Sequence, residues 1–190
     1  MAVLASFPTQ NFELIRDRIG EILTDELTNQ SIDSVVYRER VTPFDKTDLE
    51  CLNVSLAQGD YTSKTQIDTD GEYQYNIDIY VSKKTTETDA ADKLANHRLQ
   101  KLIGIVCYIL RASQYRTLLF ANPLISHTMV TNFRIADTVN QDATTTVMAR
   151  VQFNVNCTEG SGLSDTIELD KNTTTVKLHE TDKGYIWIKP

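Results

Sequence analysis

The side chains that could perform chemistry are few and lie far apart along the chain. The three histidines, His97, His127 and His179, fall in three different predicted elements, and none has a second ligand at metal-binding spacing. A zinc site needs three or four such ligands within reach of one ion. The glycines never approach the spacing of phosphate-binding loops, and no GxSxG nucleophile motif occurs. We therefore predict no metal site, no cofactor and no catalytic residue, and hence no enzyme.

The segment DTDGE, residues 68–72, is the nearest approach to a calcium loop. Such a loop has glycine at its sixth position and acidic residues at its first and twelfth. With Gly71 at the sixth position, the other two would be Gln66 and Ile77, neither of which is acidic. We instead predict a tight turn that leads into a strand beginning at Tyr73.

Aromatic and charged side chains gather in the polar stretch GDYTSKTQIDTDG, residues 59–71, between two predicted strands. Long polar connections commonly carry binding residues. We interpret this stretch as a loop that is ordered by a neighbouring subunit. Its candidate interaction residues are Tyr61, Lys64, Asp68 and Asp70.

The composition limits the classes of protein to which the chain could belong. Its 190 residues suffice for one domain with a small appendage, and its apolar fraction of 41% is ordinary for a folded protein. The formal net charge of −7 argues against a free-standing nucleic-acid binder. We expect a soluble protein without a signal peptide or membrane span. The cysteines Cys51, Cys107 and Cys157 are predicted to be buried, reduced thiols.

Hydrophobic periodicity predicts two amphipathic helices. The first covers residues 9–27, where apolar residues recur at spacings of three and four, with Thr9 or Asn11 as its N-cap. The second is longer, has Thr88 or Asp89 as its N-cap and ends near Arg111.

Alternating apolar and polar residues predict the strands. They fall at residues 31–40, 49–57, 73–81, 124–138 and 144–159. This order of helices and strands indicates an α+β fold, in which a mainly antiparallel sheet carries two helices packed on one face.

A linker, EGSG, separates a small C-terminal β extension from the rest of the chain. We place the main domain at residues 1–158 and the extension at 159–190, with short strands in DTIELD, TTVKLHE and GYIWIKP. The last of these contributes three further candidate interaction residues, because large apolar side chains near a chain end need a surface to cover them. They are Tyr185, Trp187 and Ile188.

The order of elements resembles that of the tail terminator, or tail completion, proteins of long-tailed bacteriophages. Three segments carry the resemblance after the first helix: residues 35–61, with two strands split by a polar break; residues 73–106, a strand running into a long helix; and the terminal hairpin of residues 133–157. The resemblance covers roughly residues 10–158, and the extension departs from the compact members of that family.

The resemblance implies a structural virion protein that is made in the host cytoplasm and is located at the head-proximal end of the tail. Such proteins form a hexameric ring on the tail tube, stop its polymerisation and join it to the head connector. DNA passes through the ring without sequence-specific binding. Whether the sheath of a contractile tail is a further partner stays open.

Two other readings of the chain remain. One is a head–tail adaptor or a tail tube subunit, which shares much of the same fold. The other is a small-molecule-binding or hydrolytic α+β domain, which would need a polar cluster in a cleft.

Overall fold

The computed structural model describes residues 9–41, 50–63, 68–84, 90–120, 124–136, 139–141, 144–160, 173–177 and 184–188. The chain divides into two units, Met1–Glu159 and Gly160–Pro190. The first unit holds both helices and a six-stranded sheet, and the second holds a two-stranded sheet.

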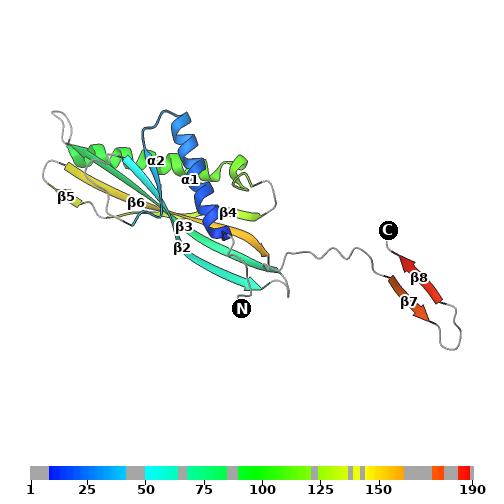
Figure 1. Ribbon diagram of the computed structural model, residues 1–190. Helices are drawn as coiled ribbons and strands as arrows, with labels where there is room; N and C mark the ends of the chain where they lie inside the picture. Colours follow the sequence, from blue (N-terminus) through cyan, green and yellow to red (C-terminus); the bar gives the residue numbers. More distant parts are fainter. Residues whose placement is uncertain are drawn as a thin grey trace. The chain divides into compact units, whose positions relative to one another are not determined.

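Two helices and a mainly antiparallel sheet make up the first unit, which confirms the predicted α+β class (Figure 1). The sheet order is β1-β2-β3-β6-β4, with β5 also paired to β6. In chain order the elements are α1 (Asn11–Asn29), β1 (Val35–Arg38), β2 (Glu50–Ser63), β3 (Asp68–Lys84), α2 (Ala91–Arg111), the 3-10 turn η1 (Ser113–Tyr115), β4 (Ile125–Ile135), β5 (Val139–Gln141) and β6 (Thr144–Gly160).

One pair of strands departs from the antiparallel pattern. β1 runs parallel to β2, with Val35 opposite Cys51 and Arg38 opposite Val54. The pairs β2–β3, β4–β6 and β5–β6 are antiparallel. β1 and β4 are the two ends of the described sheet, so its two edges are unlike in length and direction.

One face of the sheet is apolar, and both helices cover it. On β3 the buried residues recur at every second position, from Tyr73 to Val81, as the predicted alternation requires. α1 packs on β1 and β2, while α2 packs on β3 and β4. Each fully buried large apolar side chain stabilises the fold by roughly 1.5–3 kcal/mol. The helix stripes that meet this face are Ile15, Ile19, Leu23 and Leu27 on α1, and Leu99, Leu102, Val106 and Leu110 on α2.

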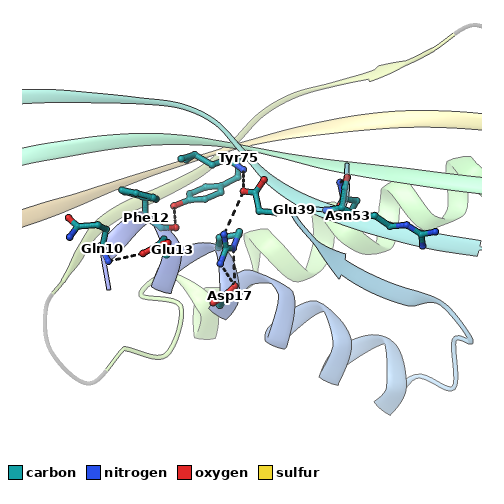
Figure 2. Close-up of polar contacts among 10 residues, drawn as sticks. Gln10, Phe12, Glu13, Asp17, Glu39, Asn53 and Tyr75 are labelled. Carbon is teal, nitrogen blue, oxygen red and sulfur yellow. Dashed lines mark hydrogen bonds and ion pairs between the residues drawn. The ribbon is translucent and has the colours of Figure 1, made fainter. Parts of the chain in front are cut away.

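Polar bonds fix the beginning of α1 against the sheet (Figure 2). The Tyr75 hydroxyl donates a hydrogen bond of 2.8 Å to the backbone carbonyl of Phe12. Glu39, just beyond β1, accepts a hydrogen bond of 2.8 Å from the Leu56 backbone N–H and lies 3.8 Å from an Arg16 nitrogen. These bonds tie α1 to β2 and β3.

The helix starts differ slightly from those predicted. Gln10 is the N-cap of α1, and its backbone N–H donates to the Glu13 carboxylate at 3.0 Å. The prediction of Thr9 or Asn11 was wrong, because the acid three residues after Gln10 supplies the bond. The N-cap of α2 is Ala90, which is extended, rather than the predicted Thr88 or Asp89.

The opposite face of the sheet is polar yet partly buried. Asn53 is 6% exposed, and its side-chain amide makes two hydrogen bonds with the Arg40 backbone, of 3.0 and 3.2 Å. The amide thereby pairs with the chain beyond β1 as a neighbouring strand would. Neither helix in the described part of the chain is long and apolar enough to cross a membrane.

The second unit is a hairpin of β7 (Thr173–Lys177) and β8 (Gly184–Ile188), paired antiparallel. Thr174 lies opposite Trp187, and Val176 lies opposite Tyr185. The predicted strand DTIELD, residues 165–170, lies outside the described residues.

Candidate interaction surfaces

The stretch predicted as a loop, residues 59–71, is instead strand at all of its described residues, 59–63 and 68–71. β2 continues to Ser63 and β3 begins at Asp68, so that Tyr61 lies opposite Gly71. The predicted tight turn at Gly71 was therefore also wrong. Glycine and aspartate lower the local strand signal of this stretch, but cross-strand contacts of the aromatic residues outweigh that weak propensity.

Two glycines make room for the ring of Tyr73. A Cβ at Gly59, which lies opposite Tyr73, would be 2.9 Å from the ring. A Cβ at Gly71 would be 3.0 Å from the Tyr73 hydroxyl oxygen. Both positions therefore need glycine so that the ring can lie against the backbone, where it is 1% exposed.

The Glu159 carboxylate of β6 connects three elements, because it binds both the Tyr73 hydroxyl of β3 and the Asn11 side chain of α1. The Tyr73 hydroxyl donates a hydrogen bond of 2.5 Å to one oxygen of Glu159, and Asn11 donates a bond of 2.7 Å to the other oxygen. Burial, and then the bond to Glu159, raise the pKa of Tyr73 far above its usual value, so the hydroxyl stays a donor. Burial likewise raises the pKa of the nearby Cys157 thiol to about 12, with Glu159 adding to the effect.

Tyr61 is the solvent-facing member of this group. It is 59% exposed, and its ring meets that of Tyr73 edge to face at a centroid distance of 5.9 Å. Their hydroxyl oxygens are 3.2 Å apart. The paired strands β2 and β3 therefore hold the Tyr61 side chain in place and expose it to solvent. An exposed aromatic side chain of this kind is a suitable contact for a partner.

The other predicted interaction residues fall into two groups. Asp70 lies on β3 and accepts a hydrogen bond from Thr158 at 3.5 Å, while Lys64 and the Asp68 side chain lie outside the described residues. Tyr185, Trp187 and Ile188 all lie on β8, in the second unit, and their side chains also lie outside the described part.

A surface that the sequence did not predict lies between α2 and β4. It is a groove of about 610 Å³ whose apolar lining includes Ile103, Val130, Phe133 and Ile135. Phe133 is 54% exposed and Ile135 is 49% exposed. The pairing of β4 with β6 shifts between Val130 and Asn132, so simple alternation in the sequence did not reveal which side chains share this face.

The groove has open space beside Gly104 and a cysteine in its wall. An added Cβ at Gly104 would meet no atom within 4 Å. Cys107 also lines the groove and is only partly buried, contrary to the prediction that all three cysteines are buried. It lies on α2 between the buried stripe and the solvent-facing side, a position that the helical pattern leaves ambiguous.

The stretch of sequence that supplies both walls of the groove is basic in a chain that is otherwise acidic. Residues 93–136 include six basic residues and no acidic residue, against a net charge of −7 for the whole chain. Arg111 lines the groove, the exposed Arg116 lines an adjoining hollow with it, and Arg134 lies between the lining residues Phe133 and Ile135 of β4, on the opposite face of the strand. Arg134 lies directly opposite Arg150 in the β4–β6 pairing.

No group of His, Cys, Asp and Glu side chains among the described residues could hold a metal ion. No protein-family model and no curated protein matches the chain. Several solved structures are similar to it, and one of them matches over 77% of this chain and 96% of its own length, with 14% sequence identity and a TM-score of 0.41. A likeness at that level assigns neither a family nor a function.

Proposed function

We propose that this chain is a structural protein of a long-tailed bacteriophage, a tail terminator whose copies form a hexameric ring on the finished tail tube. The ring stops polymerisation of the tube and offers a surface to the head connector, while DNA passes through its lumen. Its partners are then other copies of itself, the tube protein and the connector. The protein is made in the host cytoplasm and resides at the head-proximal end of the virion tail.

The observation that carries the proposal is the pair of unlike edges of one helix-backed sheet. β1 is a four-residue edge paired in parallel, whereas β4 is an eleven-residue edge paired antiparallel. Exposed strand edges favour pairing with other chains. Two different edges on one rigid body favour head-to-tail contacts, which close into a ring when the rotation between copies allows it.

The projecting ribbon of β2 and β3 supports a second kind of contact. All residues from Ala57 to Ser63 are exposed, and the paired strands continue past the start of α1 (Figure 1). The buried Tyr73 stiffens this ribbon, because its hydroxyl holds Glu159 of β6. A stiff ribbon that carries the exposed Tyr61 suits a contact with the tube or with the next layer of the tail.

Electron microscopy of tails assembled with gold-labelled protein tests the proposal. We expect label only at the head-proximal end, including on tails that lack heads. Label along the whole tube would contradict a terminator and indicate a tube subunit. Label that stays with isolated heads and is absent from headless tails would indicate a head–tail adaptor instead.

A further inference from the structure

We propose that the groove between α2 and β4 binds residues 163–170 of a second copy of this chain, added as a strand along the free edge of β4. The contact rests on the proposed ring and names the surface that would join neighbouring copies. Three observations support it: the apolar groove, the unpaired edge of β4 beside the groove, and the opposite charges of β4 and of residues 163–170.

The groove adjoins the last strand of the sheet, because Val130, Phe133 and Ile135 of β4 line it. β4 ends the described sheet, and no described strand pairs with its outer edge. An added strand would place alternate side chains over the groove, on the side of Phe133 and Ile135. Exposed apolar side chains beside an unpaired strand edge are a recurrent binding site for extended segments.

The residues at 163–170, LSDTIELD, match this surface in alternation. In an extended strand, Leu163, Ile167 and Leu169 share one face, and Glu168 and Asp170 share the other. The first face is apolar apart from Asp165, as the groove requires. The segment carries three acidic residues and no basic residue, whereas the lining of the groove includes Arg111 and no acidic residue among the described side chains.

Arg134 gives the acidic face a specific partner. It lies opposite Arg150, and like charges facing each other across two strands are unfavourable. Asp78 binds Arg150 through both carboxylate oxygens, but no ion pair involves Arg134 within the described residues. An acidic residue on an added strand, such as Glu168, would compensate the exposed charge of Arg134.

The position where the chain leaves β6 indicates that the bound segment comes from a second copy and not from the same chain. Thr158 donates a backbone hydrogen bond to Leu124, so β6 leaves the sheet at the end where β4 enters it. A segment that followed β6 directly to the outer edge of β4 would have to cross the chain that enters β4. Connections at one end of a sheet rarely cross in this way.

Disulfide trapping in the full-length chain tests the contact. The variant Ile167→Cys is exposed to a mild oxidant, in concentrated solution and on assembled tails, and compared with the control Asp25→Cys at an exposed position of α1. Cys51 and Cys157 are 0% and 1% exposed, so Cys107 is the accessible native thiol. We expect Ile167→Cys to give linked dimers and larger species, and peptide mapping to show Cys107 joined to the introduced cysteine.

A charge exchange tests the same contact without relying on a disulfide. In the Ile167→Cys background, Arg134→Glu should lower the disulfide-linked fraction about fivefold. This is the change in binding expected when an exposed ion pair is replaced by two like charges. Adding Glu168→Arg should restore the linked fraction. Loss without restoration would overturn the proposed partner of Arg134.

Three outcomes would overturn the contact as a whole. A linkage confined to species of monomer mass would place the segment on its own chain. Efficient linkage through Trp187→Cys, with none through Ile167→Cys, would identify the β7–β8 hairpin as the occupant. No linkage to Cys107 in solution or on tails would exclude the segment from the groove. If labelled protein still marks the head-proximal end, only this contact fails, whereas linkage without that location would contradict the proposed function alone.

Discussion

Asp78 on β3 and Arg150 on β6 form a two-bond ion pair across the centre of the polar sheet face. Arg150 Nε donates to one carboxylate oxygen at 2.7 Å, and its terminal nitrogen donates to the other at 2.8 Å. The Asp78 side chain is 7% exposed, whereas that of Arg150 is 45% exposed. The pair joins two strands that lie far apart in the sequence.

Removing Arg150 should therefore destabilise the fold through the carboxylate that it leaves behind. We expect Arg150→Met to lower the free energy of unfolding by about 1–3 kcal/mol, the cost of leaving a buried polar group without its partner. The double variant Arg150→Met with Asp78→Leu should cost less than the sum of the single changes. Urea unfolding measures all three, and strict additivity would show that the pair contributes no coupling.

The fit of Tyr73 against Gly59 predicts an unusual response to a small substitution. In most strands alanine is tolerated better than glycine. Here Gly59→Ala should destabilise by about 1–3 kcal/mol, because the added methyl would lie 2.9 Å from the ring and force it to move. Thr62→Ala on the same strand is exposed and should stay within about 0.5 kcal/mol of the parent. Equal stabilities for the two variants in thermal unfolding would refute the close approach.

Glu50 at the start of β2 predicts how stability depends on pH. Burial would raise the pKa of Glu50, but hydrogen bonds from Arg98 and Lys83, as short as 2.7 Å, outweigh burial and lower it. The carboxylate therefore contributes stability above its unfolded pKa of about 4.3, and this is lost as pH falls through the lower folded value.

The matching measurement compares the parent with Glu50→Gln in urea at several pH values. The variant should be less stable at neutral pH, and the difference should shrink below about pH 4. The control Glu21→Gln removes a carboxylate whose side chain is 46% exposed and should change stability little at any pH. A Glu50→Gln deficit that grows on acidification would give the opposite sign and contradict the argument.

Two glycines inside helices should respond differently to alanine. Gly104 on α2 faces open space, so Gly104→Ala should stabilise by up to about 1 kcal/mol through helix propensity alone. Gly20 on α1 lies under Arg38, and an added Cβ would be 2.6 Å from its Nε. Gly20→Ala should gain less or lose stability, because Arg38 must move. Equal gains in melting temperature would show that Arg38 yields freely.

The sequence predicted the helices and central strands because each has two chemically different faces. β3 and β6 alternate cleanly between buried and polar positions, and the stripes of α1 and α2 recur every three or four residues. These local patterns are strong enough to identify each element by itself.

The features that sequence reasoning missed depend on neighbours far along the chain. Nothing local shows that β1 pairs parallel with β2, or that β4 becomes an edge. The glycines at 59 and 71 suggested a loop, whereas the ring of Tyr73 packs against both of them. The α2–β4 groove combines positions from two elements whose proximity no periodicity records. The interaction roles predicted for Tyr61 and Asp70 stay predictions, and the larger apolar surface between α2 and β4 was not predicted.

The placement of β6 beside β3 determines how long one edge of β3 stays unpaired while the chain is being synthesised. β3 ends at Lys84, but its neighbour β6 begins only at Thr144, after α2 and β4 have been made. At translation rates of about 5–20 residues per second, one edge of β3 waits roughly 3–12 s for its partner. During that interval a nascent chain can aggregate through an unpaired hydrophobic strand. Slower translation lengthens this exposure, so the yield of folded protein should fall when β6 is delayed, and chaperones that hold β3 should restore it.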